Sequence, residues 1–227
     1  TYTQEATINY SVRSAVVRSG ELRDEDWKAL TALMKLSVEA DSVTITGASI
    51  ESYASPEGEI ALNEDLASDR ASSAAEAMTR GMKRMKLTAD DSFYALVPKG
   101  EDWQGFKSLM QSSNIEDKNL ILRVLEMYTD KNKREEEIRN IAKTYKEIEK
   151  DILPALRRSQ LVVSYDVEGY TDEELRNYSM SNPDMLTADE LLFAATLFDD
   201  MNDKLTIYQS AARVHADDFR GYNNAGC

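Results

Sequence analysis

Hydrophobic and polar residues alternate along several short segments of the chain, as they do in strands that bury one face. In residues 7–12 the apolar Ile8, Tyr10 and Val12 alternate with polar residues, which predicts a half-buried strand. Segments rich in β-branched or aromatic residues predict further strands at 43–50, 92–98 and 161–167. Together these segments predict a β-sheet.

Between the strands, apolar residues recur every three or four positions, which is the spacing of an amphipathic helix. The first helix has Asp24 as its expected N-cap, and a longer helix runs over residues 59–85. Residues 102–152 predict further helices, of which the last is one charged amphipathic helix that ends or kinks at Pro154. Its charge is expected to face solvent, with docking of a partner as the alternative. The order strand, helix, strand, helix, strand, helical insertion, strand predicts an α+β fold with helices packed on a mixed sheet.

The C-terminal quarter of the chain has a different pattern. Residues 169–186 are polar and turn-rich, which predicts a linker. Two amphipathic segments separated by a very short turn follow in 187–227 and predict a helical hairpin. Tyr208 and Ala211 stand where a tetratricopeptide repeat carries aromatic and small packing residues, so the hairpin resembles such a repeat. The linker is therefore expected to join a domain over 1–168, which includes the insertion, to this hairpin.

The resemblance to a tetratricopeptide repeat is partial. Lys204 occupies the usual small position, and Ala216 stands where proline is common. Tyr222 and Gly226 resemble the opening of a following repeat. Because about three repeats normally stack to bury a shared core, a chain that stops here predicts a truncated array.

Composition excludes several classes of function. The net charge of −14 opposes binding to nucleic acids and to anionic membrane surfaces, because phosphate contacts need clustered Lys and Arg. Cys227 is the one cysteine, so neither an internal disulfide nor a paired-cysteine zinc site is expected, and the lone His215 is expected to be structural. No apolar run is long enough to span a membrane. No signal peptide is visible, so the chain is either cytosolic or a form from which an export signal has been removed.

The turn SPEG at 55–58 and the elements beside it hold the most specific chemistry in the sequence. A strand-like run precedes this turn, and the helix that follows it carries Asn63 and Arg70. Seven residues are nearly two helical turns, so both polar side chains lie on one face and close to the turn. This layout predicts a small site for an anionic ligand. In the structural alternative, Arg70 ties its helix to the turn or to Asp65 and Asp69.

The same stretch resembles the OmpA-like peptidoglycan-binding domain of Gram-negative envelope proteins. In that family a strand ends in a Gly-Tyr-Thr-Asp-like turn, and a Gly, an Asn, a Leu and an Arg-Ala pair follow. The corresponding residues here are Tyr53, Ala54, Ser55, Gly58, Asn63, Leu66, Arg70 and Ala71. Arg157 and Arg158 resemble the Asn-Arg-Arg sequence that leads into the last strand of the family. The resemblance covers residues 6–167, and the helical insertion is longer than the usual connection.

The resemblance implies a non-catalytic role on the periplasmic side of the outer membrane. Members of the family hold the outer membrane or its proteins to the wall by binding the diaminopimelate side chain of the peptidoglycan stem peptide. Arg70 is implied as the first carboxylate contact and Arg157 or Arg158 as the second, because a guanidinium binds a carboxylate bidentately. Asn63 would offer a donor and an acceptor, and backbone N–H groups at 57–61 would bind the remaining oxygens.

Ser55 departs from the family, which has an aspartate at this position that pairs with the ammonium group of the ligand. A serine can form a hydrogen bond but cannot neutralise a charge. The charge contact is therefore lost unless Glu51, Glu57 or Glu59 replaces it. A second interpretation stays open, in which the fold is kept as a scaffold, wall binding is lost, and the hairpin docks another envelope protein.

The sequence gives no pattern of catalytic residues. Glu57 with Glu59, and Asp90 with Asp91, are the candidate acid–base pairs, but nothing distinguishes them beyond their acidity. No Ser-His-Asp order, phosphate loop or dinucleotide fingerprint occurs. The chain is therefore not expected to be an enzyme or to hold a cofactor or a metal ion.

Overall fold

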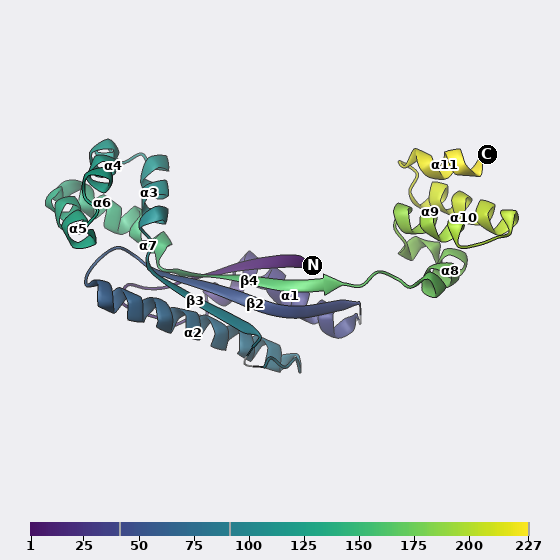
Figure 1. Cartoon of the computed structure of the whole chain (residues 1–227), viewed down its shortest axis with the longest axis horizontal. Helices are drawn as coiled ribbons and strands as arrows, with labels where there is room; N and C mark the ends of the chain where they lie inside the picture. The colour runs from purple at the N-terminus through teal and green to yellow at the C-terminus, as the bar shows by residue number, and fades with distance from the viewer. Residues whose placement is uncertain (41, 91, 227) are drawn as a thin grey trace. The chain divides into compact units, whose positions relative to one another are not determined.

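The computed structural model describes residues 1–40, 42–90 and 92–226. Asp91, the second member of one acidic pair, and Cys227 lie outside these ranges. The chain divides into two compact units, Thr1–Val167 and Glu168–Cys227. Each unit has a hydrophobic core of its own. Figure 1 labels the helices and strands of both units.

A mixed β-sheet forms the centre of the first unit. Its described strands are β1 (Tyr2–Asn9), β2 (Val43–Ala54), β3 (Tyr94–Glu101) and β4 (Arg158–Val167). Their order across the sheet is β1-β4-β2-β3. β4 is antiparallel to both β1 and β2, whereas β2 and β3 are parallel. The predicted α+β fold with a mixed sheet is confirmed.

The first strand lies earlier in the chain than the predicted range 7–12. β1 ends at Asn9, although Tyr10 still donates its backbone N–H to the carbonyl of Arg157 at 2.8 Å. The chain then turns, and Arg13 adopts a left-handed backbone with φ of 52°. Val12, predicted on the buried side of the strand, is 55% exposed.

The strand predicted at 43–50 and the strand-like run before the SPEG turn form one strand, and the strand predicted at 92–98 ends later than predicted. β2 continues to Ala54, and β3 passes through Pro98 to Glu101. An edge strand tolerates a proline because the side that lacks the N–H can face away from the neighbouring strand. The register between β2 and β3 shifts beside this proline, between Ser52 and Tyr53.

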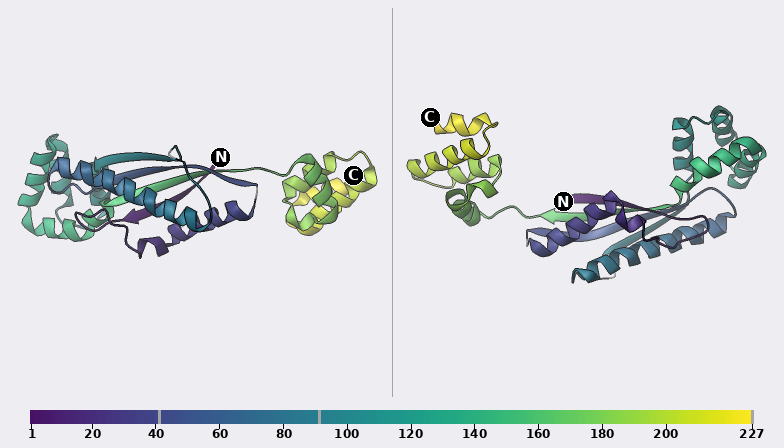
Figure 2. Two further views of the ribbon diagram at one scale, coloured as in Figure 1. Left: turned by 90° about the horizontal axis from the view of Figure 1, so that it is seen from below. Right: turned by 180° about the vertical axis from the view of Figure 1, so that it is seen from behind.

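Two helices pack on one face of this sheet. They are α1 (Glu25–Glu39), which a 3₁₀ turn at Glu21–Arg23 precedes, and α2 (Ile60–Arg84) (Figure 2). Asp24 stands at the N-cap of α1 as predicted, but its side chain makes no capping hydrogen bond. One continuous cluster joins both helices to the sheet, and its buried members include Ala6, Ile8, Leu30, Met34, Ile50, Met78, Leu161 and Val163.

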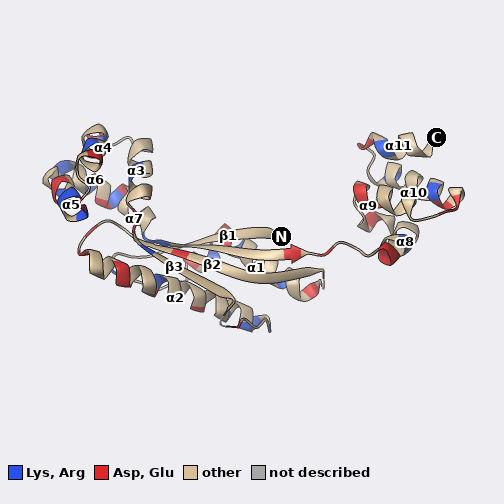
Figure 3. Ribbon diagram, in the orientation of Figure 1, with Lys and Arg blue, Asp and Glu red and all other residues tan. Residues whose placement is uncertain are grey.

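The insertion between β3 and β4 is helical, as predicted, and has a separate core. Its helices are α3 (Trp103–Ser112), α4 (Lys118–Met127), α5 (Lys131–Asn140), α6 (Ala142–Asp151) and α7 (Leu153–Leu156). The single charged helix predicted before Pro154 is wrong, because the chain breaks at Ile141 into α5 and α6. The Thr144 hydroxyl donates to the carboxylate of Asp117, 2.5 Å away, and this contact fixes α6 against the start of α4. Figure 3 shows acidic and basic residues side by side on α5.

The second unit is helical throughout its described length. It contains α8 (Asp172–Ser181), a 3₁₀ turn at Pro183–Met185, α9 (Ala188–Thr196), α10 (Met201–Val214) and α11 (Phe219–Ala225). The predicted hairpin is present as α9 and α10. The predicted linker at 169–186 is wrong, because a capping box between Thr171 and Glu174 starts α8 there. In the ranges that the structure describes, no helix is both long and apolar enough to cross a membrane.

Candidate functional site

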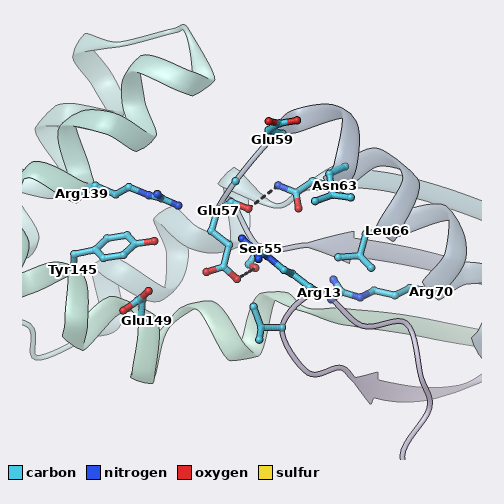
Figure 4. Close-up of a pocket in the computed structure, with 13 residues that line it drawn as sticks. Arg13, Ser55, Glu57, Glu59, Asn63, Leu66, Arg70, Arg139, Tyr145 and Glu149 are labelled. Carbon is cyan, nitrogen blue, oxygen red and sulfur yellow. Dashed lines mark hydrogen bonds between the residues drawn. The ribbon is translucent and has the colours of Figure 1, made fainter.

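The SPEG turn connects the end of β2 to the start of α2 and borders a cavity of about 640 Å³. Gly58 permits this turn because its φ is +91°, a conformation that side chains with a Cβ rarely adopt. Figure 4 shows side chains from the turn, from α2 and from the insertion around the cavity. The residues that line it are Val12, Arg13, Ser55, Glu57, Gly58, Glu59, Leu62, Asn63, Leu66, Arg70, Arg139, Tyr145 and Glu149.

Arg70 is fully buried, and its guanidinium is already bound within the protein. Its Nε donates to the carbonyl of Ser14 at 3.0 Å, Nη1 to that of Tyr53 at 2.8 Å and Nη2 to that of Ser11 at 3.4 Å. Its charge also lies 5.1 Å from the ring centre of Tyr10. Burial lowers the pKa of Arg70 to about 10, so the side chain remains a cation at neutral pH. Arg70 therefore ties α2 to the 11–14 segment and to β2, and not to Asp65 or Asp69.

Asn63 supports the turn from the first part of α2. Its side-chain nitrogen donates to the carbonyl of Glu57 at 3.1 Å and to the carboxylate of Glu101 at 3.0 Å. Glu101 also accepts a hydrogen bond from the Trp103 indole at 2.8 Å. Because both amide protons are used, Asn63 offers a ligand its carbonyl oxygen alone.

Glu57 is the acidic group that lies against Ser55. The Ser55 hydroxyl donates to Glu57 Oε1 at 2.8 Å, and Arg157 donates to the same oxygen at 2.8 Å from Nη2 and 3.1 Å from Nε. Glu59 also lines the cavity, whereas Glu51 pairs instead with Lys99 at 3.1 Å. Of the three glutamates considered as replacements for the family aspartate, Glu57 is the one that contacts Ser55.

The two arginines before β4 have different partners. Arg157 does not line the cavity, but it donates to two residues that do: to Glu57 in an ion pair and to the Ser55 hydroxyl at 3.2 Å from Nε. Arg158 pairs with Asp102 at 2.7 Å and stacks on Tyr53, with its charge 4.4 Å from the ring centre. Five of the predicted site residues thus line one cavity: Ser55, Glu57, Gly58, Asn63 and Arg70. Arg157 and Arg158 do not line it.

Arg13 is a site residue that sequence reasoning missed. It makes no hydrogen bond or ion pair with any residue that the structure describes, and Figure 4 shows its side chain reaching toward the cavity. Its left-handed backbone, with φ of 52°, costs a non-glycine residue about 1–2 kcal/mol. Such strain is concentrated at functional sites. No sequence pattern marks Arg13, because its place depends on the turn that follows β1.

The insertion supplies a second wall of the cavity, which was also missed. Figure 4 shows Arg139 and Tyr145 pointing in from this side. Arg139 pairs with Glu135 at 2.6 Å, and its charge lies 5.5 Å from the ring centre of Tyr145. Burial raises the pKa of Tyr145. Tyr145 and Glu149 share a face of α6 at a spacing of four residues, but that spacing does not tell which part of the protein the face meets.

Charge is balanced around this cavity. Arg13, Arg70 and Arg139 line it together with Glu57, Glu59 and Glu149. A mixed lining of this kind suits a ligand that carries both a carboxylate and an ammonium group. Within the described parts of the chain, no group of His, Cys, Asp and Glu is arranged as a metal site.

No family model matches this chain, and no curated protein matches it. The OmpA-like and tetratricopeptide-like resemblances therefore rest on the residues quoted above.

Proposed function

We propose that the first unit is a non-catalytic module that binds the diaminopimelate-containing stem peptide of peptidoglycan, in a periplasm-facing protein associated with the outer membrane. The observation that supports this most is the balanced cavity at the SPEG turn, which Glu57, Arg13 and Arg139 line together. Diaminopimelate in a stem peptide offers carboxylate and ammonium groups, which this lining complements. The OmpA-like spacing of Asn63 and Arg70 supports the same ligand.

The contacts around the cavity assign different roles from those implied by the family resemblance. Glu57 would bind the ammonium group through Oε2, because its other oxygen, Oε1, already accepts from Ser55 and Arg157. Arg13 would bind a carboxylate bidentately, since its guanidinium has no partner among the described residues. Arg70 would contribute positive potential from a fixed position, because three backbone carbonyls already hold it.

Retention of the whole chain on purified peptidoglycan tests the proposal. We expect wild-type protein to be retained and Arg13→Gln to bind at least about tenfold more weakly, since a charge-assisted hydrogen bond contributes about 1.5–3 kcal/mol. Arg23→Gln is the matched control, because Arg23 is exposed and lies away from the cavity lining. Arg70→Ala is unsuitable, because it removes three internal contacts. A wild-type chain that is not retained even at low salt contradicts the proposal.

A second candidate function has one observation in its favour. The C-terminal unit exposes large apolar side chains, with Met201 71%, Phe219 76% and Tyr222 54% exposed. Phe219 and Tyr222 are three residues apart on α11 and therefore share a face, and contiguous exposed apolar patches are typical of surfaces that bind protein partners. If peptidoglycan is not bound, we propose instead that the first unit is a scaffold and that this helical unit docks another envelope protein.

A further inference from the structure

A carboxylate from the insertion binds two of the residues that line the cavity beside the SPEG turn, although it does not itself line the cavity. Glu135, on α5, accepts a hydrogen bond from the backbone N–H of Gly58 at 2.7 Å. The same oxygen, Oε1, forms an ion pair with Arg139, whose Nη2 lies 2.6 Å away. Gly58 and Arg139 both line the cavity. A backbone N–H and a guanidinium at this point therefore hold a carboxylate that belongs to the chain itself.

The contact joins two segments that are far apart in the sequence. Gly58 and Glu135 are 77 residues apart, so nothing local requires them to meet. Glu101 contacts both segments: it accepts a hydrogen bond from Asn63 at 3.0 Å, and it lies 4.0 Å from Lys131 at the start of α5. The Glu135 side chain is 13% exposed, and that of Arg139 is 50% exposed. The carboxylate is thus sheltered, while the cation that holds it remains open to solvent.

We propose that Gly58 N–H and Arg139 form a carboxylate subsite of the cavity, and that Glu135 is an internal competitor that fills it until a carboxylate ligand takes its place. The identity of that ligand as a stem-peptide carboxylate rests on the proposed function. The subsite itself rests on the contacts of Glu135.

The competition follows from charge and hydrogen bonding. The single Gly58 N–H donates to one carboxylate at a time, and a second carboxylate beside Glu135 would be repelled by its charge, so either Glu135 or the ligand occupies the subsite. An apparent dissociation constant rises in inverse proportion to the fraction of molecules in which the subsite is open. If Glu135 leaves it open about one tenth of the time, removing the Glu135 carboxylate tightens binding about tenfold.

The test is an acetate titration of the whole chain, followed by NMR at the Gly58 amide. Acetate is the smallest carboxylate probe, and acetamide is its neutral counterpart. Glu135→Ala removes the competitor and keeps a strong helix former on α5. Glu136→Ala is the matched control, because it removes the same charge from an exposed neighbour on the same helix.

We expect acetate, but not acetamide, to shift the Gly58 resonance saturably in Glu135→Ala, with about tenfold weaker binding in wild type and Glu136→Ala. No shift in Glu135→Ala, or equal affinities in all three proteins, overturns the subsite. Retention on peptidoglycan is measured with the same variants. If acetate binds as expected and no variant is retained, the proposed function fails and the carboxylate subsite stands.

Discussion

At the scale of single residues, the function of an arginine here depends on its partners. Arg70 has the spacing of a ligand-binding residue, but its guanidinium is buried and bound by backbone carbonyls. Arg13 has no sequence signature, but it lines the cavity without a partner among the described residues. The residue with the family spacing therefore builds the site, and a neighbour outside the motif is the better candidate for ligand contact.

The structural role of Arg70 predicts a large effect on stability. Arg70→Lys is expected to lower the free energy of unfolding by about 3 kcal/mol, because a lysine cannot reach all three carbonyls and leaves buried acceptors unsatisfied. Urea denaturation measures this change. Arg80→Lys is the control, since Arg80 is exposed on the same helix and forms a surface pair with Glu76; we expect a change below about 0.5 kcal/mol. Equal stability of the two variants would show that Arg70 does not hold the 11–14 segment.

At the scale of elements, acidic side chains bind backbone N–H groups at the open edge of the sheet. β1 is an edge strand, and two of its N–H groups that do not face β4 are bound by carboxylates: Thr7 N–H by Asp26 at 2.7 Å and Asn9 N–H by Glu21 at 2.8 Å. Covering an edge in this way hinders pairing with another strand. Asp26 lies in the first turn of α1 and Glu21 in the 3₁₀ turn before it, so they link the edge of the sheet to this part of the chain.

Substitution by alanine is expected to have opposite effects at two helical glycines, Gly105 and Gly81. Asp102 caps α3 by accepting from Gly105 N–H at 2.7 Å and also pairs with Arg158. A Cβ at Gly105 would lie 2.7 Å from Asp102 Cγ, so Gly105→Ala displaces that carboxylate and is expected to lower the free energy of unfolding by about 2 kcal/mol.

Gly81 has Met34 Sδ as its nearest neighbour at 3.8 Å, so Gly81→Ala is expected to stabilise α2 by about 0.5–1 kcal/mol. Thermal and urea unfolding measure both, and a destabilised Gly81→Ala would contradict this account.

At the scale of the whole molecule, two units have separate cores. Leu161 is buried among the sheet and its helices, and Ile207 is buried among helices of the second unit. Both tryptophans of the chain, Trp27 and Trp103, belong to the first unit. Tryptophan fluorescence therefore reports unfolding of the first unit, whereas far-UV circular dichroism reports both.

Separate cores predict separate unfolding transitions. Ile207→Ala is expected to cost about 2–5 kcal/mol in the second unit and to leave the midpoint of the fluorescence transition in urea unchanged. Leu161→Ala is expected to lower that midpoint by a comparable free energy. Circular dichroism of the same samples should show a transition that Ile207→Ala alone moves. A single transition moved equally by both substitutions would mean that the units unfold cooperatively.

Local patterns in the sequence predicted most of the elements. Period-two and period-four spacings depend on neighbours in the chain, so the sheet, the two long helices and the α9–α10 hairpin follow from them. The error at 169–186 was avoidable, because Thr171 and Glu174 have the spacing of a capping box. The break at Ile141 could not be predicted from the sequence, because helical periodicity continues across it.

The sequence alone determined the order of the elements and the place of the candidate site at the turn between β2 and α2. Only the tertiary structure decided which groups at that site are free. A guanidinium reaches several ångströms from its backbone, so its partners belong to whichever segments pack nearby, as the carbonyls of Ser11 and Ser14 do for Arg70. For the same reason, the meeting of Glu135 with Gly58, 77 residues away, is absent from any local pattern and exists only once the insertion has folded against the turn.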